Sequence, residues 1–244
     1  IETLPCTGVF WRPGHQINVA PSNVTLHSQM AMWSAKWLGE KEMLTMNGHD
    51  HGHENMVEGL WNLIDEADMI VAHNGNRFDR TWCNTEFLYA GLPPPSYPKW
   101  IDTLTVSRQT FNFESHRLDQ IARRLGVGKK IKTDFELWTD WMKGEPKAIK
   151  AMTKYCNMDV KVLQAVYYKL RPWMKNHPNV AVYGDGKRPA CNMCGSTKVR
   201  KVGLSYTNSG IYQRYRCNDC GAPLKGRKTM LESEHKANAL VGDK

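Results

Sequence analysis

The chain has 244 residues, of which 41% are hydrophobic and 23% are charged. This length holds one medium-sized domain and a small second one, and this composition excludes a globally disordered chain. The sequence contains no apolar run that is long enough to cross a bilayer, and it does not open with a secretion signal. We therefore expect a soluble, intracellular protein without a membrane partner.

The formal net charge of +9 is unevenly distributed along the chain. Residues 181–244 contain twelve Lys and Arg against five Asp and Glu, whereas residues 1–180 contain 21 against 19. A basic segment of this kind either binds a polyanion, with release of counterions from its phosphates, or forms a solvated tail. Charge alone does not choose between the two.

Apolar periodicity and turn residues predict strands first, then alternating helices and strands. Strands are expected at residues 3–11, 28–37, 42–46 (the weakest of them), 68–73 and 100–102. Helices are expected at residues 54–67, 78–90, 103–109, 117–125, 134–142 and 145–170. Asp102 or Thr103 is the expected cap of the third helix, and Ser115 that of the fourth. This order predicts an α/β domain with a mixed sheet flanked by helices.

Composition also predicts where the domains begin and end. We expect an α/β domain at residues 1–180, a linker rich in Gly, Asp and Pro at 181–189, a small β domain at 190–230 and a flexible tail at 231–244.

Three short segments of the first domain carry carboxylates next to regular elements. Glu2 adjoins the first strand, Asp79 follows the strand that ends at His73 and Asn74, and Tyr155 lies one helical turn before Asp159. Taken one at a time, these residues are more typical of an exposed strand end, a helix start and a half-buried pair than of a metal site. If the carboxylates converge, they repel one another unless a hard divalent cation such as Mg²⁺ or Mn²⁺ lies between them.

The order of the three segments resembles the DEDD superfamily of 3′→5′ exonucleases, in the branch with a tyrosine in its third motif. Its motifs read D-x-E, H-N-x-x-x-F-D and Y-x-x-x-D, and the matching segments here are IET, HNGNRFD and YCNMD. The segments WSAKWLGE, IDTL and LGVGKK are similar to prophage and bacterial members. The resemblance covers about residues 1–180. It implies an RNase H-like fold and a place in the cytoplasm of a bacterium or a phage-infected cell.

By this resemblance, Glu2, Asp79 and Asp159 are ligands of two Mg²⁺ or Mn²⁺ ions, and Tyr155 positions the attacking water. The family motif has one more aspartate, which is expected immediately before Ile1. We therefore expect a chain that is shortened at its N-terminus, rather than a natural form that lacks this ligand. Asn74 belongs to the edge of the site and is a candidate contact for nucleic acid.

Two further clusters of the first domain leave alternatives open. The histidines of GHDHGH, at positions 49, 51 and 53, are typical of either a metal site or a polar connecting loop, and the loop is favoured. Lys129, Lys130 and Lys132 either interact with a helix end or contact the substrate backbone.

Four of the seven cysteines form two CxxCG units, at Cys191, Cys194, Cys217 and Cys220. In a chain without a secretion signal, this spacing predicts one structural Zn²⁺ held by four thiolates. The other three, Cys6, Cys83 and Cys156, are expected to be plain thiols. Alternation predicts strands at residues 198–202 and 212–216 between the two units.

The segment QRYRCNDCG resembles the zinc ribbons of transposases and transcription factors, which bind nucleic acid or partner proteins. Basic and aromatic residues near the cysteines are candidate contacts for nucleic acid, namely Arg200, Lys201, Arg214, Tyr215 and Arg216. The alternative is a zinc ribbon that has a purely structural role or that docks onto a protein.

The resulting hypothesis is a hydrolase that shortens mostly single-stranded nucleic acid from its 3′ end by a two-metal-ion mechanism and releases nucleoside monophosphates. DNA is favoured over RNA, and a polymerase or replication protein is a further candidate partner. The alternative is a catalytically inactive adaptor of the same fold that binds nucleic acid or a replication complex.

Overall fold

A computed structural model describes residues 1–10, 19–208 and 210–240. The chain divides into two compact units, Ile1–Tyr167 and Tyr168–Lys244, which we call the body and the C-terminal unit. The division falls within the longest helix, so the limits predicted at residues 180 and 190 stay predictions.

The strands of the body form three small sheets. An antiparallel sheet has the order β1 (Glu2–Thr3), β4 (Met30–Ala35) and β5 (Leu44–Asn47). A second antiparallel pair joins β2 (Thr7–Gly8) to β3 (Val24–Leu26), and a parallel pair joins β6 (Met69–Ala72) to β7 (Lys99–Asp102). The body therefore has both antiparallel and parallel pairing, in separate sheets rather than in one mixed sheet.

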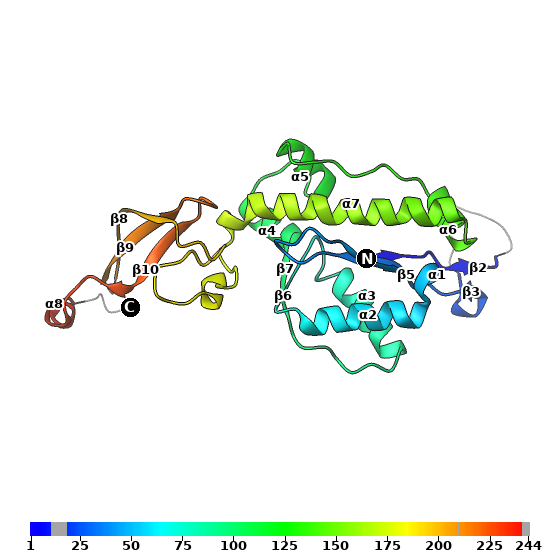
Figure 1. The fold of residues 1–244 in the computed structure, drawn as a ribbon, viewed down its shortest axis with the longest axis horizontal. Helices are drawn as coiled ribbons and strands as arrows, with labels where there is room; N and C mark the ends of the chain where they lie inside the picture. Colours follow the sequence, from blue (N-terminus) through cyan, green and yellow to red (C-terminus); the bar gives the residue numbers. More distant parts are fainter. Residues whose placement is uncertain (11–18, 209, 241–244) are drawn as a thin grey trace. The chain divides into compact units, whose positions relative to one another are not determined.

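Helices cover both sides of these strands, as Figure 1 shows, with α7 on one side and α2 and α3 on the other. The helices are α1 (Gly48–His51), α2 (His53–Glu66), α3 (Asp79–Tyr89), α4 (Thr103–Thr110), α5 (Leu118–Arg124), α6 (Glu136–Met142) and α7 (Pro146–Leu170). Short 3₁₀ turns lie at Pro21–Asn23, Arg171–Trp173 and Val180–Tyr183.

The central strand β4 is buried on both faces and joins two apolar clusters. Trp33 packs with residues of α2 and α3, including Met56 and Phe87. Met32 packs with residues of α6 and α7, including Met152. Because β4 contributes to both clusters, it holds the two helical layers around one core. The predicted α/β fold class is confirmed.

The N-terminal segment differs most from its prediction. Instead of one strand over residues 3–11, the structure has only the short β1 and β2, with Pro5 between them. Proline has no backbone N–H and so does not continue a ladder of hydrogen bonds. Trp11, at the end of the predicted strand, lies outside the described residues.

Two local predictions near helix starts are corrected. Residues 48–51, expected as a loop, form the short helix α1 because the Asn47 side chain accepts hydrogen bonds from the backbone N–H groups of His49 and Asp50. Ser115 is not the cap of α5, since that position falls on Arg117, whose side chain makes no capping bond. The expected cap of α4 is confirmed at Asp102, which accepts from the N–H groups of Leu104 and Thr105.

The C-terminal unit is built on an antiparallel sheet of order β10-β9-β8. Its strands are β8 (Val199–Thr207), β9 (Gly210–Cys217) and β10 (Pro223–Thr229). The first two extend the predicted strands, whereas the third was not predicted. Part of the predicted flexible tail forms helix α8 (Ser233–Asn238), and residues 241–244 lie outside the described residues. Within the described chain, no helix is long and apolar enough to span a bilayer.

Candidate active site and metal centre

Glu2 is carried by the short strand β1. Its Cα pairs with Met32 on the buried strand β4, so the glutamate is anchored to the middle of the body. The pKa of the Glu2 carboxyl is raised to about 7, chiefly by burial. The α-amino group of Ile1 and Lys130 oppose this rise, and the nearby Asp159 and Asp79 carboxylates add to it. Glu2 thus lies in a partly dehydrated position among other charged groups.

Asp79 begins helix α3, directly after the turn that follows strand β6. In this turn Asn74 has a positive φ of 69°, a conformation that asparagine tolerates better than most residues. A side chain at Gly75 would clash, since its Cβ would lie 2.4 Å from the Cβ of Ala72. The chain can therefore turn sharply here, and the Asp79 Oδ1 atom lies 3.1 Å from the α-amino nitrogen of Ile1, next to Glu2.

Asp102 holds this turn from the neighbouring strand β7. Its carboxylate accepts hydrogen bonds from the N–H groups of Asn74 (2.9 Å) and Asn76 (3.3 Å) in addition to capping α4. Asp102 is 6% exposed. From the sequence, Asp102 is a candidate acidic neighbour of the site, although a helix cap is favoured. Its contact with the turn depends on the parallel pairing of β6 with β7, which no local pattern shows.

Tyr155 and Asp159 lie one turn apart on α7, and Lys130 reaches both. The Lys130 ammonium group forms an ion pair with the Asp159 carboxylate, and its nitrogen is 3.4 Å from the Tyr155 hydroxyl oxygen. The same nitrogen lies 5.3 Å from the centre of the Tyr155 ring. Burial raises the pKa of Asp159, and the hydrogen bond from Lys130 opposes that rise.

The three carboxylates of Glu2, Asp79 and Asp159 therefore come from three elements that are far apart in sequence and interact electrostatically. Two ammonium groups, of Ile1 and Lys130, are the cations that neutralise them. Within the described residues, Asp159 Oδ1 is buried without a hydrogen-bond partner. An orphaned carboxylate oxygen in an acidic cluster is typical of a missing ligand partner, so these residues fit a hard divalent cation.

The carboxylates are not packed as tightly as the cysteines described below. Among the described residues, the four-cysteine cluster is the one group of three or more candidate ligands whose atoms all lie within 4.8 Å of one another. A divalent ion that binds at Asp159 would compete with the Lys130 ammonium group for this carboxylate.

The remaining predicted contacts of the body lie in different surroundings. Lys129 is exposed, whereas its neighbour Lys130 is turned toward Asp159 and is 29% exposed. Asn74 lies in the turn before Asp79, half-buried. The Nε2 atom of His73 donates to the carbonyl oxygen of His116 (2.9 Å), which ties the same turn to the segment before α5.

The histidines of GHDHGH have separate partners rather than a common one. His49 Nε2 lies 2.8 Å from the carbonyl oxygen of Trp141, and His53 Nε2 lies 3.0 Å from the buried carboxylate of Glu86. His51 Nδ1 lies 3.2 Å from the carbonyl oxygen of Asn47. These contacts hold α1 and the start of α2 in place.

The two CxxCG units of the C-terminal unit form one compact cluster. The Sγ atoms of Cys191 and Cys220 are 3.6 Å apart, those of Cys194 and Cys217 are 3.7 Å apart, and all four lie within 4.8 Å of one another. Burial raises the pKa of the Cys217 thiol, but hydrogen bonds from the backbone of Cys220 and Asp219 outweigh it and lower that pKa to about 7. Four sulfur atoms so arranged fit a single tetrahedral thiolate-bound ion.

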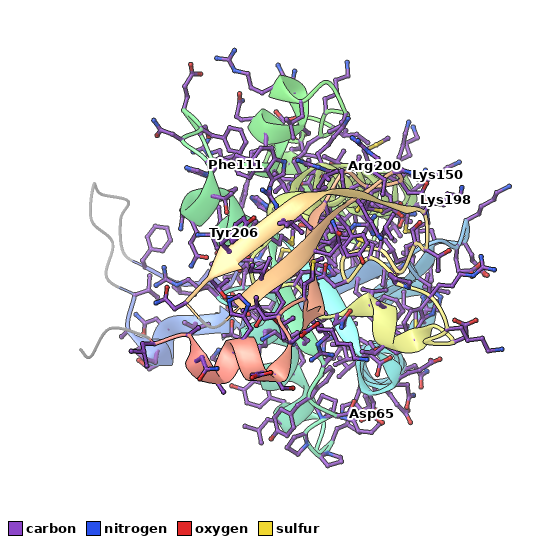
Figure 2. The ribbon with its side chains drawn as sticks, turned by 90° about the vertical axis from the view of Figure 1, so that its left-hand side faces the viewer. Asp65, Phe111, Lys150, Lys198, Arg200 and Tyr206 are labelled. Atoms are coloured by element: carbon purple, nitrogen blue, oxygen red, sulfur yellow. The ribbon has the colours of Figure 1, made fainter. Side chains whose placement is uncertain are left out.

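The basic residues predicted to bind nucleic acid lie on the two strands between the CxxCG units. Arg200 and Lys201 lie on β8, and Arg214 and Arg216 on β9, and all four are exposed. Figure 2 shows Arg200 toward one end of β8 and Tyr206 toward the other. Tyr215 lies between the two β9 arginines and is half-buried.

Comparison with known proteins finds a family that matches this chain and one related protein. Residues 24–171, more than half of the chain, match the family described as the RNase H superfamily. Over 118 residues the chain is 34% identical to DNA polymerase III PolC-type of Ureaplasma parvum serovar 3. That match covers 48% of this chain and 7% of the polymerase, so the chain corresponds to a small part of the relative.

Proposed function

The chain belongs to the RNase H superfamily, and on this premise we propose that its body is a 3′→5′ exonuclease that hydrolyses single-stranded nucleic acid. The observation that carries the proposal is the convergence of Glu2, Asp79 and Asp159 around a buried, unpaired carboxylate oxygen. The similarity to a DNA polymerase III of the PolC type supports DNA as the favoured substrate and a replication protein as a partner.

In the proposed mechanism, Glu2, Asp79 and Asp159 would hold two Mg²⁺ or Mn²⁺ ions. Such ions, when bound, activate water and stabilise the oxygen that leaves the phosphodiester. The Tyr155 hydroxyl lies on the same face of α7 as Asp159 and orients the attacking water by a hydrogen bond. Lys130 forms an ion pair with Asp159. With an ion bound at Asp159, the Lys130 ammonium group would be available to contact a phosphate of the substrate.

In the C-terminal unit, we propose that Cys191, Cys194, Cys217 and Cys220 hold one structural Zn²⁺. The close spacing of their four sulfur atoms supports this assignment. Because the residues around the cluster bury only a small core, the metal supplies much of the free energy that folds this segment.

The test is the shortening of a 5′-labelled single-stranded oligonucleotide in Mg²⁺ or Mn²⁺, resolved on a denaturing gel. We expect a ladder that shortens from the 3′ end and disappears in Asp79→Asn and Asp159→Asn. Tyr155→Phe should slow the reaction by about 10²-fold with little change in KM. Asp68→Asn, at an exposed aspartate outside the site, is the matched control and should leave the ladder unchanged.

Two further arms sharpen this experiment. Matched DNA and RNA strands decide the substrate, with DNA expected to be shortened faster. A second chain with one aspartate immediately before Ile1 restores the D-x-E motif and should be the more active of the two. If both chains bind the oligonucleotide and neither shortens it, the exonuclease proposal fails and the inactive adaptor of the same fold takes its place.

A further inference from the structure

The register of the C-terminal sheet decides which basic side chains share a face. Arg200 of β8 pairs with Arg216 of β9, and Lys225 of β10 pairs with Arg214 of β9. Side chains directly opposite each other lie on the same face, and so do residues two apart on one strand. Arg200, Arg214, Arg216 and Lys225 therefore project from one side of the sheet, which we call the arginine face.

The opposite face carries different chemistry. Lys201 pairs with Tyr215, one residue away from the Arg200–Arg216 pair, so both point to the other side of the sheet. Cys217 and Leu224 share that side and pack into the apolar cluster around the cysteines. The residues predicted from sequence to contact nucleic acid are thus divided between two faces, and Lys225 was not among them.

The arginine face is exposed and positively charged. All four of its basic side chains are exposed. The three strands contain no Asp or Glu, and among the described residues none of the four side chains takes part in an ion pair. Arg216 donates one hydrogen bond to the carbonyl oxygen of Gly221 at 2.9 Å, which leaves its remaining N–H groups for a ligand.

An aromatic ring lies on the same face. The Lys225 Nζ atom is 4.9 Å from the centre of the Tyr212 ring, and Tyr212 is two residues from Arg214 on β9. The cation–π contact confirms that the two side chains share a face and holds the ammonium group beside the ring.

We propose that the arginine face binds the backbone of single-stranded nucleic acid. Guanidinium groups match phosphate oxygens in a bidentate geometry, and residues two apart on a strand are spaced by about 7 Å. Rows of cations beside an aromatic ring suit a ligand that alternates phosphates with bases. The identity of the ligand rests on the proposed function, whereas the choice of face rests on the register alone.

Binding is measured separately from cleavage. The full zinc-loaded chain carries Asp159→Asn in every sample, and the anisotropy of labelled oligo-dT and oligo-rU is followed as salt is varied. Arg200→Gln and Arg214→Gln should each weaken binding about fivefold near 0.1 M salt and reduce the slope of log K against log salt by about 0.7. Lys225→Gln is an independent variant on the third strand and should act in the same direction.

The matched control is Lys201→Gln, which removes one charge from the residue next to Arg200 but on the opposite face. It should weaken binding by less than about twofold. If Lys201→Gln and Arg200→Gln weaken oligonucleotide binding equally, the proposed face is wrong. The contribution of a positive charge to binding would then not depend on the face of the sheet that carries it. Unchanged binding in all three arginine-face variants would also overturn it and would leave an acidic protein as the occupant of this face.

Zinc content and melting temperature of each variant verify that the fold is intact. The two proposals fail independently of each other. A 3′-shortening ladder from the chain with an intact Asp159, together with unchanged binding in all three arginine-face variants, would contradict the proposed face and support the exonuclease. Weakened binding in Arg200→Gln, together with the absence of a 3′-shortening ladder, would support the proposed face and contradict the exonuclease activity.

Discussion

Lys130 forms an ion pair with Asp159 across the candidate active site, from the loop between α5 and α6 to the long helix α7. The pair is partly buried, with the lysine and aspartate side chains 29% and 19% exposed. An ammonium group in this position and a divalent cation compete for the same carboxylate. The first prediction follows from that competition.

Lys130→Gln should destabilise the metal-free chain by about 1–2 kcal/mol, because it leaves the Asp159 carboxylate partly buried without a counterion. The same change should tighten Mn²⁺ binding about tenfold, since the ion no longer displaces an ammonium group. Urea unfolding and calorimetric titration with Mn²⁺ measure the two effects. Lys129→Gln removes the same charge from an exposed neighbour and should change neither. Weaker Mn²⁺ binding in Lys130→Gln would contradict the competition.

A second prediction concerns Asp102, which accepts hydrogen bonds from backbone N–H groups at both Asn74 and Leu104. Asp102→Ala should cost about 3 kcal/mol of stability, because it uncaps α4 and leaves donors of the turn before Asp79 unpaired. Chemical unfolding measures this loss. Asp134→Ala removes an exposed carboxylate that accepts one bond, from the N–H of Leu137 at 3.3 Å, and should cost at most about 1 kcal/mol. Equal losses would show that the link to the turn contributes nothing.

The contrast between Asp102 as a cap and Asp102 as a partner of Asn74 shows what sequence could predict. Local sequence signals were sufficient to predict the cap of α4, most of the helices, and the strands at Met30–Ala35 and Met69–Ala72. These predictions succeed because apolar periodicity and helix capping act within a few residues. The contact with Asn74 depends on a parallel pairing of strands that are about 30 residues apart, and no local pattern encodes it.

Strand β10 and the Lys130 ion pair escaped prediction for related reasons. The sequence PLKGRKT has little β propensity, and it becomes a strand because β9 offers it an unpaired edge. In the sequence, Lys130 is one member of a basic cluster. Its approach to Asp159 depends on the tertiary contact between α7 and the loop that joins α5 to α6. The cysteine cluster, by contrast, was visible from spacing alone, since two CxxC turns restrict where four sulfur atoms can go.

A third prediction tests the metal in that cluster. Cys194→Ser and Cys217→Ser should each lower the zinc content below one ion per chain and expose the amides of β8, β9 and β10 to hydrogen exchange. The free energy of a structural zinc site is on the order of 10 kcal/mol, and most of it is lost with one ligand. Metal analysis and hydrogen exchange by mass spectrometry measure both. Cys6→Ser, at an exposed cysteine outside the cluster, is the control, and zinc retained in full by Cys194→Ser would rule out four-thiolate ligation.

The last prediction concerns pH and His73, whose Nε2 atom donates to the carbonyl oxygen of His116. Burial lowers the pKa of His73 below its ordinary value of 6.5 in the folded body, so the unfolded chain binds a proton here more readily than the folded one. The stability that neutral His73 contributes is therefore complete above about pH 6.5, decreases as the pH falls below that value and levels off below the folded pKa. Urea unfolding between pH 7.5 and 5, at intervals, should show this decrease, and His73→Gln should have a flatter profile. His27→Gln, at an exposed histidine, should keep the slope of the parent chain. If His73→Gln keeps it as well, protonation of another group drives the loss of stability.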